Sequence, residues 1–145
     1  PITHEEMTRF NISLQDGVKM VMYALENHLG GEIFVPKIPS YKILDVAKAI
    51  APECRTEIVG IRPGEKLHEE MITDTDSLNT IDLGIYYAIL PSVSFTYTEE
   101  DFMKHHKASK VPFGFRYSSG TNTQWETVDG LRKLIAKQIN QDFAL

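Results

Sequence analysis

The sequence predicts an α/β fold, and three observations support that prediction. Over the first 70 residues the apolar patterns read strand, helix, strand, helix, strand, loop and helix, an alternation typical of layered α/β proteins. The chain has 145 residues, of which 42% are hydrophobic and 24% are charged, a composition that can bury one core. No internal repeat, low-complexity stretch or long linker divides it. We therefore expect a single domain over residues 1–145.

The first predicted strand covers residues 7–12, where apolar and polar residues loosely alternate. Ser13 then opens a helix, with Asp16 three residues later as in a capping box. Gly30 and Gly31 end this helix. Its apolar residues recur at helical spacing, and they are Val18, Val21, Met22, Leu25 and Leu29.

Further along the chain, a strand is expected over residues 32–35 and a second helix over residues 43–50, whose apolar side chains share one face. β-Branched residues predict a third strand over residues 56–61. A turn at Arg62–Glu65 leads to a short helix over residues 66–71. The remaining predicted segments are a polar loop over 74–80, a strand over 85–90, a helix over 99–107, an aromatic strand over 113–117, a loop over 118–124 and a last helix capped by Thr127.

Composition excludes several classes of protein. The formal net charge is -5 and the Lys and Arg residues are dispersed, so we expect no nucleic-acid partner. No apolar run is long enough to cross a bilayer, and no basic-then-apolar leader is present, so we expect neither a membrane partner nor secretion. The single cysteine, Cys54, is consistent with a cytoplasmic location. Because the chain begins at Pro1 without Met, we expect a fragment or a processed product.

The Arg62–Glu65 loop is the most informative chemical feature. An Arg at a strand end presents a planar fork of donors that suits phosphate oxygens. Pro63 and Gly64 allow a tight turn, and the Glu65 carboxylate could accept from paired ribose hydroxyls. These features suit a nucleoside diphosphate, whereas the spacing alone also fits a surface turn with a solvated ion pair.

Two other cations are candidates. Arg9 stands in the middle of a predicted strand, so an inward-facing side chain would need an anionic partner such as a substrate phosphate, while the alternative is a solvent-facing position. Lys37 follows a strand on a Pro-rich loop and is expected to be simply exposed. The His residues lack metal-ligand spacing, so we expect no metal site.

Motifs for catalysis and for cofactor binding are missing from the sequence. None of the six Tyr residues has a Lys four positions later, and none of the nine Gly residues builds a Gly-x-Gly-x-x-Gly turn for a dinucleotide. No Gly-x-Ser-x-Gly elbow offers a nucleophile. We therefore expect no catalytic residue and no cofactor site in this chain.

Four groups of residues carry a resemblance to a known family. They are Met7–Phe10, Gly30–Ser40, Gly60–Glu69, and Tyr117–Ser119 with Asn122, Gln124 and Trp125. In this order they resemble the carboxy-terminal portion of the inverting UDP-N-acetylglucosamine 4,6-dehydratases, which are extended short-chain dehydrogenase/reductases of polysaccharide and flagellin-sugar biosynthesis. The resemblance spans essentially the whole chain, and the two long Gly-led segments are its specific part.

The resemblance implies that two parts of the enzyme have different functions. In enzymes of this family, an amino-terminal Rossmann domain holds NADP and the catalytic Asp, Lys and Tyr, and the carboxy-terminal part clamps the UDP moiety. By resemblance, Arg62 contacts the diphosphate, Glu65 contacts the uridine ribose, and Arg9 also reaches the diphosphate. Asn11 and Glu69 occupy nearby positions where contacts occur in the family. The expected ligand is therefore UDP-N-acetylglucosamine or a related UDP-sugar.

The chain lacks about the first half of such an enzyme, including its NADP-binding part. Without NADP the reaction has no electron carrier, so this chain alone is not expected to catalyse. Val18, Val21 and Leu25 should then expose an apolar face, which predicts a homo-oligomer or pairing with a Rossmann half. Three functions stay open: this portion of the dehydratase, the same portion of a UDP-sugar epimerase, or a stand-alone, non-catalytic nucleotide-sugar-binding module.

Overall fold

A computed structural model of the chain describes residues 1–94, 96–139 and 143. The protein has α-helices and β-sheets, as the predicted α/β class requires, and it forms two compact units built from alternating stretches of chain. The first unit comprises Pro1–Ser13, Ile38–Glu69 and the residues from Ser118 onward, and the second comprises Leu14–Lys37 and Glu70–Tyr117. The expectation of one domain over the whole chain stays a prediction.

The first unit contains a two-stranded antiparallel sheet. Strand β1 (Thr8–Phe10) pairs with β3 (Ser40–Lys42), and Arg9 lies opposite Tyr41. A strand within residues 7–12 is thus confirmed, whereas β3 had no signal in the sequence. On its other side β3 meets the chain near Trp125, because Ser40 donates its N–H to Gln124 O at 2.9 Å and accepts from Glu126 N at 2.8 Å.

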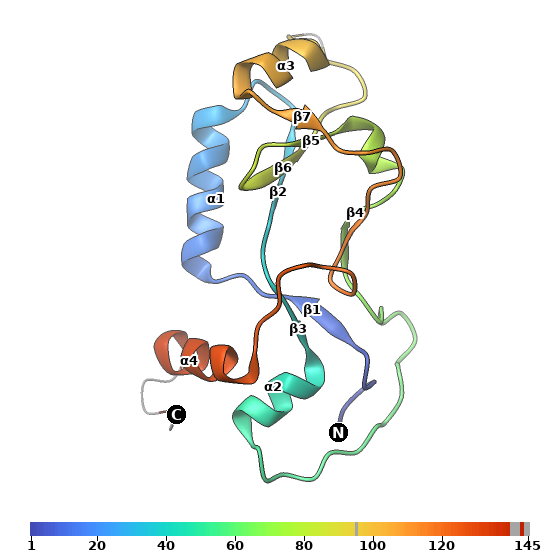
Figure 1. Cartoon of the computed structure of the whole chain (residues 1–145), viewed down its shortest axis with the longest axis vertical. Helices are drawn as coiled ribbons and strands as arrows, with labels where there is room; N and C mark the ends of the chain where they lie inside the picture. The colour runs from blue at the N-terminus through green and yellow to red at the C-terminus, as the bar shows by residue number, and fades with distance from the viewer. Residues whose placement is uncertain (95, 140–142, 144–145) are drawn as a thin grey trace. The chain divides into compact units, whose positions relative to one another are not determined.

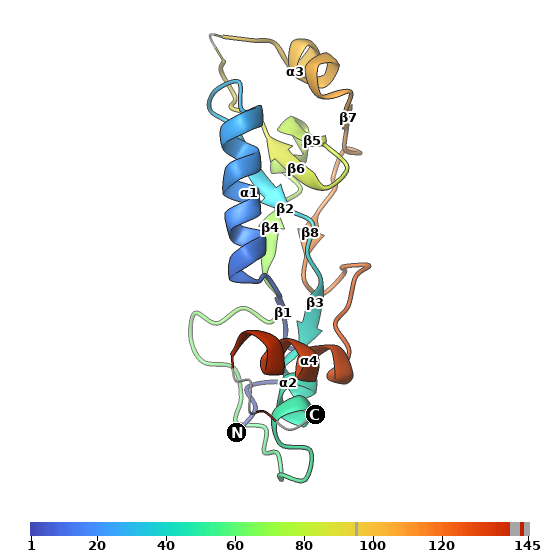
Figure 2. The same cartoon turned by 90° about the vertical axis from the view of Figure 1, so that its left-hand side faces the viewer.

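Two helices complete this unit. Helix α2 (Ile43–Ile50) and helix α4 (Val128–Gln138) pack against each other, as both views show (Figures 1 and 2). Both are predicted from the sequence, and the cap of α4 is confirmed: Thr127 Oγ1 accepts from Gly130 N at 3.0 Å. A hydrogen bond connects the two helices, since Arg132 of α4 donates to the carbonyl of Ala49 in α2 at 2.8 Å. A cap and an apolar stripe are local signals, and for this reason both helices could be predicted.

Residues 56–61 do not form the predicted strand. Ile58 makes an isolated parallel bridge to Ile2, closed by hydrogen bonds from Ile2 N to Glu57 O at 2.6 Å and from Val59 N to Ile2 O at 2.9 Å. The residues around this bridge are exposed. β-Branched residues favour an extended backbone, but a strand also needs a partner along its length.

The predicted helix over residues 66–71 is also wrong. A helix requires each N–H to reach the carbonyl four residues earlier. Here the carbonyl of Leu67 instead accepts from Thr8 N at 3.1 Å, and the carbonyl of Glu69 accepts from Ser119 N at 2.8 Å. The backbone of this segment is therefore bonded to parts of the unit that are far away in sequence.

The second unit is built on a four-stranded antiparallel sheet. The strand order is β2 (Ile33–Pro36), β6 (Tyr86–Ile89), β5 (Thr80–Asp82) and β7 (Ser109–Lys110). Strands β2 and β6 confirm predicted strands. The sheet and helix α3 share the buried core of this unit, which consists of Ile81, Ala88, Leu90 and Phe102.

The second unit also holds two α-helices. Helix α3 (Glu99–His106) begins with a capping box, in which Thr98 and Asp101 satisfy each other's backbone N–H groups. Helix α1 (Leu14–Asn27) runs along the sheet beside β2 (Figures 1 and 2). Both helices are predicted from the sequence. No helix within the described residues is long and apolar enough to cross a bilayer.

The segments predicted as a polar loop and as an aromatic strand differ from expectation. Residues 74–80 contain the 3-10 helix η1 (Asp76–Asn79) and the first residue of β5. Of residues 113–117, Tyr117 alone lies in a strand, β8 (Tyr117–Ser118), which pairs with β4 (Glu70–Ile72). The preceding residues turn, because Gly114 adopts a φ of +77° that strands do not use.

Helix α1 exposes the apolar face expected from the sequence. The helix has no buried residue, and Val18, Val21 and Leu25 keep 55%, 54% and 63% of their surface. A helix with one apolar stripe normally buries it against a core. The predicted exposure is therefore confirmed, while the predicted self-association stays a prediction.

Candidate functional site

The Arg62–Glu65 loop is a tight turn that is closed twice. Glu65 N donates to Arg62 O at 3.0 Å, and Arg62 N donates to Glu65 Oε2 at 3.0 Å. Pro63 stands at the second position and Gly64, with a φ of +86°, at the third, which is the arrangement of a type II β-turn. The predicted turn is confirmed.

The turn directs its charged groups to solvent. Arg62 is exposed, and its guanidinium makes no hydrogen bond or ion pair with any residue that the structure describes. Glu65 uses one carboxylate oxygen to close the turn, and the other remains available. The loop can therefore offer a fork of five N–H donors to an anion, with a carboxylate acceptor three residues away.

Arg9 faces partly inward and finds an anionic partner within the chain. Its side chain is 22% exposed, and its Nε lies 3.8 Å from Glu69 Oε1. Its Nη1 donates to the carbonyls of Thr8 at 2.6 Å and Leu67 at 3.3 Å. Of the two expectations for Arg9, the inward-facing one is confirmed, and Glu69 already supplies the anion that this position needs.

Glu69 is positioned by backbone groups as well as by Arg9. Its Oε2 accepts from Phe10 N at 2.8 Å, so one carboxylate contacts both the Arg9 side chain and the backbone of β1. Tyr41 lies across the strand pair from Arg9. Burial raises the pKa of Tyr41, the negative charge of Glu69 raises it further, and Arg9 opposes both. These groups form a compact charged cluster on the β1–β3 ribbon.

Asn11 lies just beyond β1 and joins a different segment. Its Nδ2 donates to Glu126 Oε1 at 3.3 Å, and its N–H donates to Pro39 O at 2.8 Å. Among the described residues, no hydrogen bond or ion pair connects Asn11 or Arg9 to the turn at Arg62. The five predicted site residues thus belong to one unit and form three local groups: Arg62 with Glu65, Arg9 with Glu69, and Asn11 with Glu126.

Lys37, in the second unit, is not the exposed cation that the sequence suggested. Its Nζ donates to Asp82 Oδ1 at 2.5 Å and lies 4.3 Å from the centre of the Tyr87 ring. The side chain is only 19% exposed. The sheet register explains this position. Pro36 pairs with Tyr86, and Tyr87 pairs with Asp82, so the ammonium group of Lys37 lies beside β6 and β5.

Sequence reasoning missed a buried hydroxyl network beneath the charged cluster. Thr8 Oγ1 lies 2.8 Å from His68 Nδ1 and 2.7 Å from Ser119 Oγ, and Ser119 Oγ accepts from Glu69 N at 2.9 Å. Thr8 and Ser119 are 3% and 0% exposed. The network ties three separate segments together. In the sequence, Thr8 is marked only by its place beside Arg9 in a predicted strand, and no local pattern indicates the partners of Thr8.

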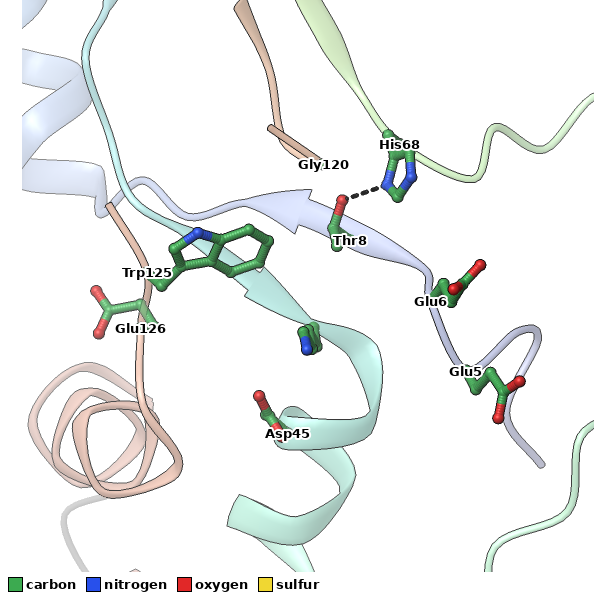
Figure 3. A pocket seen from close by; sticks show the side chains of 9 residues that line it. Glu5, Glu6, Thr8, Asp45, His68, Gly120, Trp125 and Glu126 are labelled. Carbon is green, nitrogen blue, oxygen red and sulfur yellow. Dashed lines mark hydrogen bonds between the residues drawn. The ribbon is translucent and has the colours of Figure 1, made fainter. Parts of the chain in front are cut away.

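A hollow of about 670 Å³ opens beside this network in the first unit. Figure 3 shows it from close by, with the Thr8–His68 hydrogen bond at one side and Trp125 at another. The lining residues come from the segments around β1, α2, His68 and the start of α4, and they are Glu5, Glu6, Thr8, Lys42, Asp45, His68, Gly120, Trp125 and Glu126. None of the five predicted site residues lines it.

Comparison with known proteins places the chain in a family. The sequence profile of the family described as "Polysaccharide biosynthesis protein" matches residues 1–91, more than half of the chain. The chain belongs to this family. A UDP-N-acetylglucosamine 4,6-dehydratase (inverting) from Campylobacter jejuni is 50% identical to it over 138 residues. The match covers 93% of the chain but 41% of the relative, so the chain spans well under half of that enzyme's length.

More distant members and a solved structure agree with this placement. A UDP-glucose 4-epimerase from Rickettsia canadensis is 40% identical over 92 residues, covering 61% of the chain and 27% of the epimerase. The X-ray structure of Pen from Bacillus thuringiensis superposes with a TM-score of 0.73 at 26% identity, covering 99% of the chain and 41% of that protein. The chain thus has the fold of a part of a larger, extended short-chain dehydrogenase-like protein.

Proposed function

We propose that this chain is the UDP-sugar-binding part of an NADP-dependent UDP-N-acetylglucosamine 4,6-dehydratase. The observation that carries the proposal is the closed turn at Arg62–Glu65, which holds an exposed guanidinium with no partner among the described residues. A rigid turn that presents a free Arg is suited to a diphosphate. The similarity to the Campylobacter enzyme supports a UDP-sugar as the ligand.

Each predicted site residue has a role in the proposal. Arg62 binds the diphosphate, and the free oxygen of Glu65 accepts from the ribose hydroxyls. Arg9 reaches the diphosphate only by sharing or leaving its ion pair with Glu69 at 3.8 Å, so its contribution should be smaller. Glu69 and Asn11 then act mainly by positioning β1 and the segment at Glu126.

The chemistry of the intact enzyme requires residues outside this chain. NADP would supply the hydride store, but none of the nine Gly residues forms a Gly-x-Gly-x-x-Gly turn, so the residues present do not fit that cofactor. We propose that the chain does not catalyse alone and that it pairs with a Rossmann half or with a second copy. The free, exposed Cys54 agrees with a cytoplasmic location.

A second candidate is the corresponding part of a UDP-sugar epimerase. The observation that favours it is the 40% identity to the Rickettsia epimerase over 92 residues. Product analysis with a complete enzyme that contains this chain separates the two, because a dehydratase releases water and an epimerase does not. A third candidate, a stand-alone binding module, would bind the nucleotide sugar without turnover.

Isothermal calorimetry with UDP-N-acetylglucosamine tests the proposed clamp. Arg62→Ala should weaken binding by about 1.5–3 kcal/mol, since it removes charge-assisted hydrogen bonds to the phosphates. Arg55→Ala is the matched control, because Arg55 is an exposed Arg of the same unit outside the turn. Equal affinity of the unmodified chain and Arg62→Ala would rule out phosphate binding by Arg62. No binding by the unmodified chain would exclude the stand-alone binding module as a candidate function.

A further inference from the structure

We propose that His68 is a positioning residue for the proposed UDP-sugar site. Its ring is the last acceptor in a chain of hydrogen bonds that starts at the backbone of Glu69 and runs through Ser119 and Thr8. The inference rests on the proposed function, because the chain holds the residue that pairs with Arg9. His68 is not among the site residues predicted from the sequence.

The chain of hydrogen bonds starts at a group that can only donate. Glu69 N donates to Ser119 Oγ at 2.9 Å. Ser119 Oγ lies 2.7 Å from Thr8 Oγ1, which in turn lies 2.8 Å from His68 Nδ1. Each hydroxyl has one hydrogen to donate and can also accept, whereas a ring nitrogen of His either donates or accepts. Two arrangements of the hydrogens satisfy these distances, and they differ in whether Nδ1 carries a proton.

One of the two arrangements uses every hydrogen. If Nδ1 of His68 accepts, Thr8 donates to it and Ser119 donates to Thr8. If Nδ1 donates instead, Thr8 must donate to Ser119, and the hydroxyl hydrogen of Ser119 finds no acceptor among the described residues. Ser119 is fully buried, so that arrangement leaves a buried donor unpaired, which is costly. The chain therefore assigns the Nε2–H tautomer to His68.

Close packing holds the His68 ring in the same orientation. Figure 3 shows the ring bonded to Thr8, with Gly120 nearby. A Cβ on Gly120 would come within 2.6 Å of Cγ of the ring, so any larger residue there would displace it. The position of the ring is thus fixed by a hydrogen bond and by the shape of its surroundings.

The position of His68 is transmitted to the charged cluster through Glu69. Ser119 N donates to Glu69 O at 2.8 Å, so Ser119 bonds both the N–H and the carbonyl of that residue. The Glu69 carboxylate accepts from Phe10 N at 2.8 Å and lies 3.8 Å from Nε of Arg9. His68 therefore acts on Arg9 through the anion that Arg9 contacts.

Nitrogen NMR of the ring tests the tautomer without any ligand. The chain is labelled in its His rings, and a two-bond proton–nitrogen spectrum is recorded at about pH 8, where an ordinary His ring is uncharged. The signals of His68 are those that are missing from His68→Asn. We expect a protonated Nε2 and an unprotonated Nδ1. A protonated Nδ1 would overturn the proposal.

Amide hydrogen exchange of Glu69 and Phe10 tests the positioning role, because these N–H groups bond Ser119 and the Glu69 carboxylate. His68→Leu puts a methyl group in place of Nδ1 and should speed the exchange of both amides about tenfold. His68→Asn restores an acceptor oxygen there and should exchange at close to the unmodified rate. His28→Leu, which changes an exposed His of the second unit, is the control. Equal exchange in the Leu and Asn variants of His68 would contradict the role.

Calorimetry with UDP-N-acetylglucosamine separates this inference from the proposed function. His68→Leu should weaken binding about threefold, as expected when a partly exposed charge is displaced, and His68→Asn should not. In an Arg9→Ala background the two His68 variants should bind equally, and a loss that persists there would overturn the route through Arg9. No binding by the unmodified chain would refute the proposed function and the role at that site, whereas the tautomer and the exchange rates would still decide whether His68 holds Glu69.

Discussion

The side chain of Thr8 connects two segments of the first unit that lie far from it in the sequence. Its hydroxyl contacts both His68 and Ser119, and Ser119 also anchors the backbone of Glu69. Because Thr8 and Ser119 are buried, loss of one partner would leave a buried polar group without a hydrogen bond. The charged cluster of Arg9 and Glu69 therefore depends on neutral hydroxyls below it.

Replacing Thr8 by Val should expose this dependence. Val has the same shape but leaves the Ser119 hydroxyl and the His68 ring without their shared partner, so the free energy of unfolding should fall by about 1–3 kcal/mol. Urea denaturation measures the change. Thr121→Val is the control, since Thr121 is exposed, and it should change stability little. Equal stability of the two variants would contradict a structural role for the network.

Among the structural elements, the turn at Arg62–Glu65 matters most for the proposed function. Its geometry rests on Gly64, whose φ of +86° disfavours any residue with a Cβ. An added Cβ would meet no atom within 4 Å, so the cost of a substitution comes from the backbone alone. The turn can thus be disturbed without removing a charge.

Gly64→Ala should destabilise the protein by about 1–2 kcal/mol and weaken UDP-N-acetylglucosamine binding, because the left-handed conformation is strained for Ala. Gly17→Ala is the opposite case. Gly17 lies in helix α1 with no positive φ and with open space around it, so Ala there should stabilise by about 0.5–1 kcal/mol. Thermal unfolding of both variants checks the predicted signs; the same sign for both would contradict the backbone argument.

The four α-helices that the structure describes, the Thr127 cap and the tight turn could be predicted from the sequence because their signals are local. Thr127 and Gly130, for example, form their bond within three residues. The helix expected over residues 66–71 failed because the backbone there is bonded to segments far away in the sequence. The strands predicted over 56–61 and 113–117 failed because a strand exists only where another segment pairs with it.

The candidate site likewise has a part that is held by local bonds and a part that is held by bonds between distant segments. The Arg62–Glu65 turn is closed by bonds across three residues, so its sequence was enough to predict it. The partners of Arg9 and Thr8 lie about sixty residues or more away in sequence, at Glu69, His68 and Ser119. No local pattern carries that information, and only the folded chain brings them together.

At the scale of the whole molecule, the notable feature is an apolar surface on the second unit. Val18, Val21 and Leu25 of α1 are more than half exposed. A groove of about 300 Å³ lies beside them, lined mainly by apolar groups of α1 and β2. A chain that spans 41% of its Campylobacter relative would expose such a surface if the rest of the protein normally covers it.

We predict that the isolated chain associates with itself through this surface. Replacing both Val21 and Leu25 by Lys should shift the molecules toward the monomer in sedimentation velocity, because two charges in the contact are costly to desolvate. Ile139→Lys, which changes an 81% exposed residue outside α1, is the control and should not alter association. A strictly monomeric unmodified chain at all concentrations would contradict the prediction.

The most direct test of the proposed function is a set of calorimetric titrations of the unmodified chain with UDP-N-acetylglucosamine, UDP, N-acetylglucosamine and NADP. The Arg62 turn predicts saturable binding of the first two, because both carry the uridine diphosphate, and no saturable binding of the free sugar. NADP should bind much more weakly than UDP, since the chain has no dinucleotide turn. Binding of NADP as tight as that of UDP, or binding of the sugar without its nucleotide, would contradict the assignment.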